Sequence, residues 1–304
     1  MTPARHPRTL LLPALALCAI SLVWGYNWVI SKKVLAYASP LEFAGLRTLL
    51  AALPLFLVIV WRRRPLAPQD LQAAVVLGLL QTTAFITLTL AALATGAAGH
   101  TAALVYTMPF WVLLLSAPVL RERVHGAQWL ALALASVGLV LLLGPGAGGS
   151  VISKLLALLA GLCWAAAALY AKWRQRHRSN DALSLTAWQM LLGSLPLLLA
   201  LAIWPGPGIR WTPDFVWMLG YNVFLSGALA WLLWLYLLHA LPAGLVSLGM
   251  LATPAIGVLA AWVELEERPS VPEFVGMALL LLALGLVSWH AIRRHRNPPV
   301  TGQE

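Results

Sequence analysis

The segment Pro109–Arg123, PFWVLLLSAPVLRER, has a counterpart in Pro254–Arg268, PAIGVLAAWVELEER. In each segment a proline opens an apolar run, and a Glu-Arg pair follows thirteen residues after that proline. Apolar runs of this kind, closed by charged residues, are typical of helices that end at a membrane surface. The two segments therefore indicate one helical unit that occurs twice in the chain.

Further matches extend this repeat over most of the sequence. They pair Trp24 with Trp164, Lys32 with Lys172, Pro54 with Pro196, and Gly138-Leu139-Val140 with Gly285-Leu286-Val287. Shared apolar composition is the alternative explanation, but six matches in the same order favour a true repeat. Each unit contains five apolar stretches, an odd number, so the second unit enters a membrane from the opposite side.

Composition indicates an all-α membrane protein. Of 304 residues, 61% are hydrophobic and 10% are charged, whereas a soluble domain carries about 25% charged residues. A helix needs about 20 mostly apolar residues to cross a bilayer. We predict ten spans, at Leu11–Leu35, Leu41–Trp61, Leu71–Leu93, Gly99–Leu120, Gly126–Leu143, Val151–Ala171, Ala182–Trp204, Asp214–His239, Ala243–Val263 and Val271–His290.

The positive charges predict the orientation of these spans. With the N-terminus in the cytoplasm, 14 of the 20 Lys and Arg fall on the cytoplasmic side, in Arg5 and Arg8, Arg62–Arg64, Arg121 and Arg123, Lys172–Arg178, and Arg293–Arg296. This bias follows the positive-inside rule, so the net charge of +10 does not indicate a nucleic-acid partner. Both termini are then cytoplasmic. The predicted parts are a tail at 1–10, repeats at 11–144 and 151–290, and a basic tail at 291–304.

Together, the ten spans, the inverted repeat and the proline-centred fourth helix that runs into Glu-Arg resemble the drug/metabolite transporter superfamily, in its EamA-like family. The abundance of tryptophan is most similar to the bacterial aromatic amino-acid exporters of the YddG type. The resemblance implies a bacterial inner-membrane exporter that moves aromatic and other neutral amino acids by alternating access. It also implies that spans 1–4 and 6–9 surround a cavity, while spans 5 and 10 lie outside it. An exporter of hydrophobic cations or drugs is the alternative, and an intramembrane enzyme a distant one.

Polar and aromatic residues within the spans predict the cavity wall. Ser21, Trp24, Trp28 and Ser31 recur at helical spacing on one face of the first span. Such residues also bond neighbouring membrane helices to each other. As a set they favour a cavity, because polar groups are costly at this depth. The predicted cavity residues are Trp24, Asn27, Trp28, Arg47, Gln81, Phe85, Tyr106, Trp111, Trp164, Asn222, Ser226 and Trp234.

The fifteen tryptophans divide into two groups by position. Eight lie near span ends and are typical of the interfacial belt, namely Trp61, Trp129, Trp173, Trp204, Trp211, Trp217, Trp262 and Trp289. The other seven lie deeper, and we expect about half of these to serve packing. The deep indoles offer faces to an aromatic ring or an ammonium group.

Arg47 is the one basic residue well inside a span, and its repeat counterpart is Gln189. An intramembrane arginine indicates a functional site, here one that attracts a carboxylate. Snorkelling to the surface or pairing with Glu42 is the alternative. Pro109 and Pro254 are candidate hinges, or else static bends, because each removes a helix hydrogen bond.

Nothing in the sequence indicates a metal, a cofactor or a catalytic centre. Cys18 and Cys163 have no metal-ligand spacing, and the glycine pattern of Gly144–Gly149 follows a membrane helix instead of a strand. All ten acidic residues fall at span ends, in loops or in the tail. We therefore expect facilitated movement of substrate without proton exchange. The expected partners are a small-molecule substrate and the bilayer. The fifth and tenth spans have almost no polar groups, so they suit lipid contact, bracing or self-association as a homo-oligomer.

Overall fold

The computed structural model describes residues 8–120, 126–144, 149–175, 181–241, 250 and 252–296. Within these ranges the chain is built from helices, and no β-strand forms. Most of both predicted tails, the Glu122-Arg123 pair, and residues 243–249 and 251 of the ninth predicted span lie outside them.

The helices of the first repeat are α1 (Arg8–Val34), α2 (Pro40–Trp61), α3 (Leu71–Leu77), the π-helix η1 (Gly78–Ala84), α4 (Phe85–Thr95), α5 (Ala98–Val105), α6 (Met108–Leu120) and α7 (Ala127–Leu143). Those of the second are α8 (Val151–Gln175), α9 (Ala182–Ile203), α10 (Pro213–Gly220), the π-helix η2 (Tyr221–Leu229), α11 (Ala230–Ala240), α13 (Ala252–Leu265) and α14 (Val271–Arg296). The bounds agree closely with the predicted spans. In each repeat the third predicted span contains a π-helical segment between two α-helices.

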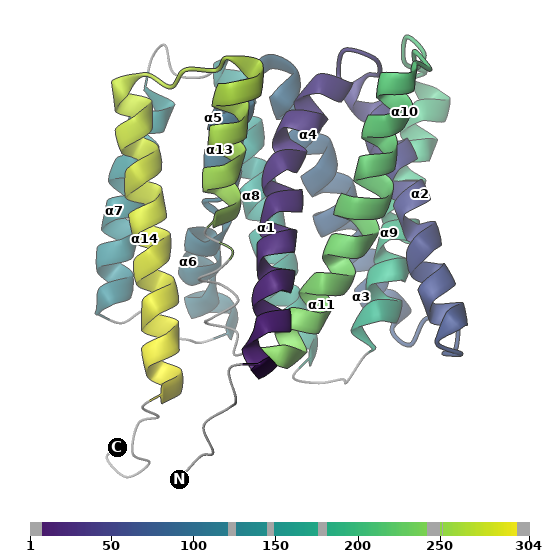
Figure 1. Cartoon of the computed structure of the whole chain (residues 1–304), viewed down its shortest axis with the longest axis horizontal. Helices are drawn as coiled ribbons and strands as arrows, with labels where there is room; N and C mark the ends of the chain where they lie inside the picture. Colours follow the sequence, from purple (N-terminus) through teal and green to yellow (C-terminus); the bar gives the residue numbers. More distant parts are fainter. Residues whose placement is uncertain are drawn as a thin grey trace.

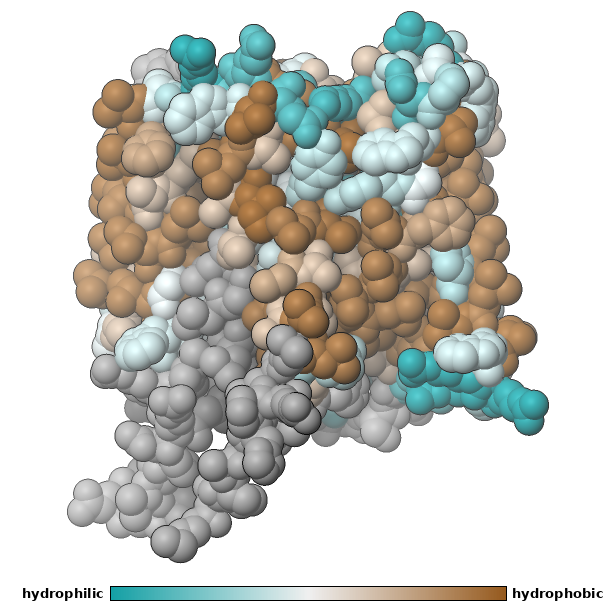
Figure 2. Space-filling model, in the orientation of Figure 1, coloured by the Kyte–Doolittle hydropathy of each residue, from teal (hydrophilic) through white to brown (hydrophobic). Residues whose placement is uncertain are grey.

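Among the described residues, eight helices are long and apolar enough to cross a membrane, and two shorter apolar helices, Ala127–Leu143 and Ala252–Leu265, accompany them. Apolar side chains cover a broad band of the face seen in Figure 2, and hydrophilic side chains gather at its two ends. The molecule is therefore a multi-pass membrane protein.

Contacts at one end of the bundle show that the second repeat is inverted. Lys32, at the end of α1, donates hydrogen bonds to Leu93 O (2.5 Å) and Gly96 O (2.8 Å), at and just beyond the end of α4. Ser153, at the start of α8, donates to Ala92 O (2.8 Å) on the same stretch of α4. Helix α8 therefore begins where α1 ends, as five spans per repeat require.

The two repeats interlock throughout. Helix α1 packs against α13, and α8 packs against α4, α5 and α6. Helix α2 packs against α9 and η2, while α9 packs against η1. Helices α7 and α14 form a separate pair at one edge of the bundle (Figure 1). Because most contacts cross between repeats, neither repeat has a complete core of its own.

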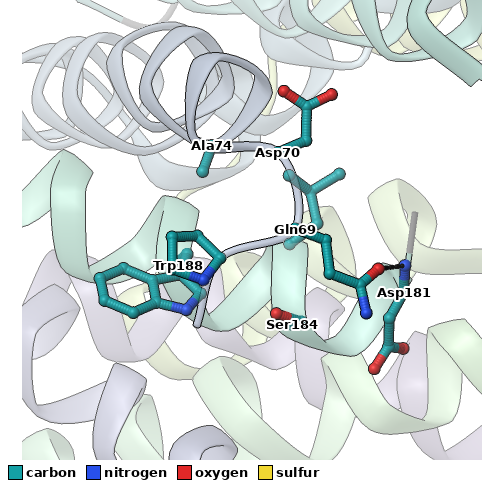
Figure 3. A pocket seen from close by; sticks show the side chains of 8 residues that line it. Gln69, Asp70, Ala74, Asp181, Ser184 and Trp188 are labelled. Carbon is teal, nitrogen blue, oxygen red and sulfur yellow. Dashed lines mark hydrogen bonds between the residues drawn. The ribbon is translucent and has the colours of Figure 1, made fainter. Parts of the chain in front are cut away.

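Helix α1 begins and α14 ends at the same end of the molecule, the lower end in Figure 1, named the terminal end here. There the loop between α2 and α3 is held by the second repeat. Arg174 donates to both carboxylate oxygens of Asp70 (2.6 and 2.9 Å), Arg64 pairs with Asp181 (2.7 Å), and Gln69 accepts from the Asp181 N–H (Figure 3). The pocket among these groups measures about 10 Å³, which barely admits one water molecule.

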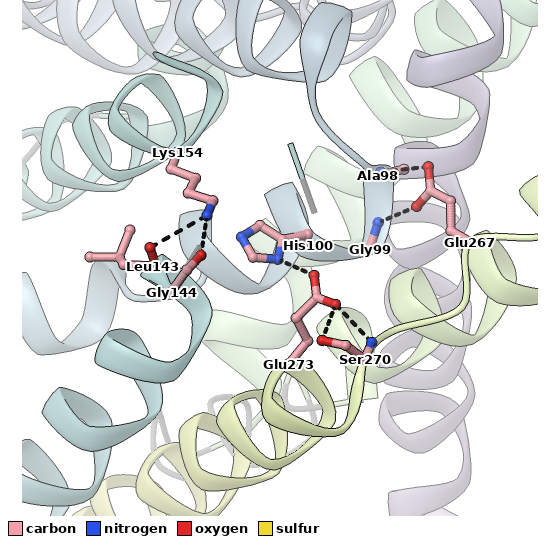
Figure 4. Close-up of polar contacts among 9 residues, drawn as sticks. All are labelled: Ala98, Gly99, His100, Leu143, Gly144, Lys154, Glu267, Ser270 and Glu273. Carbon is pink, nitrogen blue, oxygen red and sulfur yellow. Dashed lines mark hydrogen bonds and ion pairs between the residues drawn. The ribbon is translucent and has the colours of Figure 1, made fainter. Parts of the chain in front are cut away.

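The opposite end, named the far end here, is held by carboxylates that follow α13. Glu267 accepts the N–H groups of Ala98 (2.8 Å) and Gly99 (3.1 Å), so it caps the N-terminus of α5 (Figure 4). Beside it His100 Nδ1 lies 3.0 Å from Glu273 Oε1, with both side chains buried. These contacts join the fourth span to the ninth and tenth.

Two more carboxylates tie the far end across the repeats. Glu264, at the end of α13, accepts from the Tyr26 hydroxyl (2.6 Å) and pairs with Lys33 of α1. Glu42, in a capping box with Ser39, also accepts the Gly208 N–H (2.9 Å). Six acidic residues in the part of the chain that the structure describes therefore serve helix ends and ion pairs, namely Glu42, Asp70, Asp181, Glu264, Glu267 and Glu273.

The α7–α14 pair depends on two glycines that face each other. A Cβ at Gly276 would lie 2.8 Å from Gly138 O, and one at Gly138 would lie 2.7 Å from Gly276 O. The backbones approach this closely only because neither residue has a side chain.

We predict that Gly276→Ala destabilises the protein by about 1–3 kcal/mol, because the added methyl forces α7 and α14 apart. Gly285→Ala, in the same helix, is the matched control, since a Cβ there meets nothing within 4 Å. The control should leave stability unchanged or raise it slightly. Thermal unfolding in detergent measures both, and equal melting temperatures for the two variants would contradict the packing argument.

Candidate functional site

A cavity of about 350 Å³ lies between the repeats, and this volume fits a small organic molecule. Its wall comes from α1, α2, η1, α4, α5, α6, α8, α9, η2, α11, α14 and Met250. Ten of the twelve predicted cavity residues line it, namely Trp24, Asn27, Trp28, Arg47, Gln81, Phe85, Tyr106, Trp164, Ser226 and Trp234. Residues far apart in the sequence thus converge on one space.

Two predicted residues do not line the cavity. Trp111 instead donates its indole N–H to Thr107 Oγ1 (3.1 Å), beside the break between α5 and α6. Asn222 is fully buried and donates to Met218 O (3.1 Å) within its own helix. Both side chains serve local helix structure.

The π-helix η2 explains why α-helical spacing placed Asn222 wrongly. Its i→i+5 bonds widen each turn, so residues five apart share a face. Ser226 and Trp231, five apart, both line the cavity, whereas Asn222, four residues before Ser226, does not. Trp231 also lines the cavity and is absent from the prediction, although it lies three residues before the predicted Trp234 on α11.

The tryptophans form a continuous aromatic wall. Trp231 lies at the centre, with ring centroids 5.9 Å from Trp24 and 6.2 Å from Trp164. Trp24 also contacts Trp234 (6.1 Å), and Trp164 contacts Phe85 (4.7 Å). Edge-to-face and tilted pairs of this kind are favourable and leave ring faces for a bound molecule. Trp24 and Trp164, which are repeat counterparts, meet on the same central ring.

Trp24 is held in place by η2. Its indole N–H donates to Ser226 O (3.1 Å), and the return from π- to α-helix leaves such a carbonyl without a helical partner. The symmetry-related segment η1 uses Thr83, whose hydroxyl donates to Gly193 O (2.6 Å). Each π-helical segment is thus bonded to a helix of the other repeat.

The remaining tryptophans match the predicted division by depth. All eight predicted interfacial tryptophans are exposed, from 40% for Trp173 to 80% for Trp61. All seven deep ones are buried or half-buried. Trp188, one of the seven, donates to Leu66 O (2.8 Å) near the terminal end and does not line the cavity.

Arg47 brings a positive charge to the cavity wall. Its guanidinium carbon lies 5.7 Å from the centroid of the Phe43 ring. Within the described ranges it has no carboxylate partner, because Glu42 is used by Ser39 and Gly208. Its repeat counterpart Gln189 instead donates to Gln81 (3.1 Å). One side of the cavity therefore carries a positive charge, and on the symmetry-related side two neutral amides are hydrogen-bonded to each other.

The two candidate hinges differ. Pro109 lines the cavity, and the helix breaks just before it, at Tyr106 and Thr107. Pro254 is buried in the first turn of α13. Residues 242–249 and 251, which precede α13, lie outside the described ranges.

The tenth span reaches the cavity, although the resemblance implied that it lies outside. Leu284, Val287 and Ser288 of α14 all line the wall, whereas no residue of α7 does. Helix α14 packs on α5 as well as on α7, so one of its faces turns inward. Ser31, on the predicted face of the first span, also lines the wall, as do Thr82, next to Gln81, and Thr89, one turn after Phe85. Thr48 and Met190 are among the lining residues absent from the prediction. Thr48 follows Arg47 directly, and this adjacency is a signal that could have found it.

A multi-pass membrane protein with inverted repeats around an amphipathic cavity is built as a transporter. The chain belongs to the EamA-like transporter family, whose model matches residues 11–144 and 151–289.

Similar proteins span nearly the whole chain. The uncharacterized transporter YoaV of Bacillus subtilis is 27% identical over 287 residues, covering 92% of this chain and 98% of that protein. A probable amino-acid metabolite efflux pump of Escherichia coli is 29% identical over 276 residues, covering 87% and 91%. A crystal structure with a TM-score of 0.66 and 16% identity covers 93% of this chain and 98% of that one, and it shows the fold alone.

We predict that Trp24→Ala or Trp164→Ala weakens substrate binding by about 1 kcal/mol or more, because each substitution removes a ring from the aromatic wall. The controls Trp61→Ala and Trp204→Ala remove exposed rings away from the cavity (80% and 69% exposed). The apparent KM for labelled phenylalanine in proteoliposomes measures the effect. Equal losses for all four variants, in preparations matched for folding, would overturn the assignment of the wall.

Proposed function

We propose that this protein exports amino acids with aromatic or other large apolar side chains across the bacterial inner membrane. One observation carries the proposal: Arg47, which has no carboxylate partner among the described residues, shares a cavity with a wall of five aromatic rings. An amino acid of this class offers a carboxylate to Arg47 and an apolar side chain to the aromatic wall.

The electrostatic argument rests on the cost of a buried charge. A guanidinium within the bilayer span is unfavourable unless an anion or a hydrogen-bond acceptor faces it. A carboxylate is well matched, since it accepts two parallel hydrogen bonds from one guanidinium. The name of the Escherichia coli relative, an amino-acid metabolite efflux pump, is in keeping with this substrate class.

Hydrophobic cations or drugs are the second candidate, because the aromatic wall also suits a cation. Arg47 disfavours them, since two like charges repel strongly where water is scarce. The family and the relatives are transporters, and this disfavours the third candidate, an intramembrane enzyme.

The proposed topology has ten spans, made by the eight long helices and the two shorter ones. The terminal end faces the cytoplasm, since Arg62–Arg64 and Lys172–Arg174 lie there with the basic tails. Substrate reaches the cavity from either side as the two interlocked repeats rock against each other. The break before Pro109 provides a hinge within the first repeat.

We predict that Arg47→Gln reduces the flux of phenylalanine about tenfold but spares phenylethylamine, which lacks the carboxylate. Arg63→Gln is the control, because it makes the same charge change at an exposed loop. Uptake by proteoliposomes, normalised to inserted protein, is the measurement. An equal loss for both compounds, or loss of Arg47→Gln protein from the membrane, would assign Arg47 a structural role and refute the proposal.

Transport is proposed to be facilitative. Among the described residues that line the cavity there is no Asp or Glu, so the usual proton-binding group of a membrane antiporter is missing from the wall. The buried His100–Glu273 pair lies at the far end and does not line the cavity.

In counterflow, unlabelled substrate inside the vesicles should draw labelled phenylalanine inward with or without a pH gradient. A pH gradient alone should produce no accumulation. The decisive contrary result is uphill accumulation that is driven by the proton gradient and abolished by an uncoupler.

A further inference from the structure

Among the described residues that line the cavity, three have a side-chain oxygen with no hydrogen-bond partner. These oxygens are Asn27 Oδ1, Thr48 Oγ1 and Thr89 Oγ1, and each is shielded from solvent. A buried polar atom left unsatisfied destabilises a protein, so most such atoms are bonded. Helix–helix bonding, the structural explanation for polar residues in membrane spans, does not apply to these oxygens, because that role requires a partner.

The three oxygens lie in one layer of the cavity together with Arg47. Helices α1 and α4 run toward the far end, and α2 starts there. Asn27 lies about one turn beyond Trp24 on α1, and Thr89 lies one turn beyond Phe85 on α4. Thr48 directly follows Arg47 in the first half of α2. Trp24 and Phe85 of the aromatic wall therefore lie on the terminal-end side of this layer together with Gln81, while Trp28 lies beside it on α1.

The orientation of Asn27 specifies what it can bind. Its amide nitrogen donates to Ser31 Oγ (3.3 Å), one turn along α1. The amide oxygen is thus an acceptor without a donor, and an ammonium group carries only donors. A threonine hydroxyl can both donate and accept, so Thr48 can donate to a carboxylate held by Arg47.

We propose that the polar layer is a zwitterion subsite, in which Asn27, assisted by Thr89, binds the substrate ammonium while Arg47 and Thr48 bind its carboxylate. The side chain of the substrate then points toward the aromatic wall. The subsite rests on the proposed function and adds to it a requirement for both charges. Compounds that lack either the ammonium or the carboxylate bind more weakly than the α-amino acid itself.

The test measures inhibition of labelled phenylalanine uptake in proteoliposomes by unlabelled phenylalanine and by 3-phenylpropionate, which lacks the ammonium. In the wild type, phenylalanine should inhibit at about tenfold lower concentration than 3-phenylpropionate. Asn27→Leu should raise the inhibitory concentration of phenylalanine about tenfold and leave that of 3-phenylpropionate unchanged, so the preference disappears. Asn27→Asp keeps an acceptor and should retain the preference. It therefore controls for any general damage to the site by substitution at this position.

Thr89 has a matched control on its own helix. Thr87 Oγ1 is likewise buried without a partner, but Thr87 does not line the cavity. Thr89→Val should therefore weaken phenylalanine inhibition by about threefold or more, while Thr87→Val should not change it.

The outcomes separate this inference from the proposed function. If the wild type carries phenylalanine but Asn27→Leu weakens both inhibitors equally, or Thr89→Val and Thr87→Val behave alike, the subsite is wrong and the exporter stands. If the wild type carries no amino acid, the proposed function fails and the subsite fails with it.

Discussion

A polar group inside a bilayer must find a partner, and this constraint determines where nearly every polar side chain of the molecule lies. Backbone groups bond within helices. The ends of those helices are closed by carboxylates such as Glu42 and Glu267, and by Lys32. Even the carbonyl next to the π-helical turn of η2 is bonded, by Trp24. Among the described residues a minority of buried polar atoms lack a partner, and those of Asn27, Thr48 and Thr89 belong to residues of the cavity wall, where the proposed substrate supplies one.

The inverted repeat provides a symmetric frame, and differences between the two copies make the site specific. Trp24 and Trp164 are equivalent and contact the same central ring, Trp231. Arg47 and Gln189 are also equivalent, yet only Gln189 has a partner within the cavity wall, Gln81. Because the charge is present on one side alone, a polar substrate has one preferred orientation in a cavity that is otherwise nearly symmetric.

The sequence predicts much of this structure because membrane helices are defined by local composition. The span bounds, the inversion and the exposed tryptophans of the belt follow from apolar length, an odd span count and position near span ends. The break before Pro109 follows from the missing N–H of proline. These properties depend on neighbouring residues, so they can be found without the fold.

Other features could not be predicted, because they depend on contacts between distant residues. Nothing local to Gly78–Ala84 or Tyr221–Leu229 indicates a π-helix, and within η2 the cavity is lined by Ser226 and Gly227 but not by Asn222. The partners of Glu264 and Glu267 lie more than 160 residues away in the chain. The inward face of α14 depends on its packing against α5 as well as α7.

The central claim is that the cavity is an amino-acid site, and competition for a single flux tests it most directly. Reconstituted protein is given labelled phenylalanine, labelled threonine and a fluorescent hydrophobic cation in separate assays, each with the other two as competitors. The account predicts saturable phenylalanine uptake that threonine inhibits more weakly than phenylalanine itself, with no competition from the cation. Saturable uptake of the cation, without uptake of either amino acid, would contradict it.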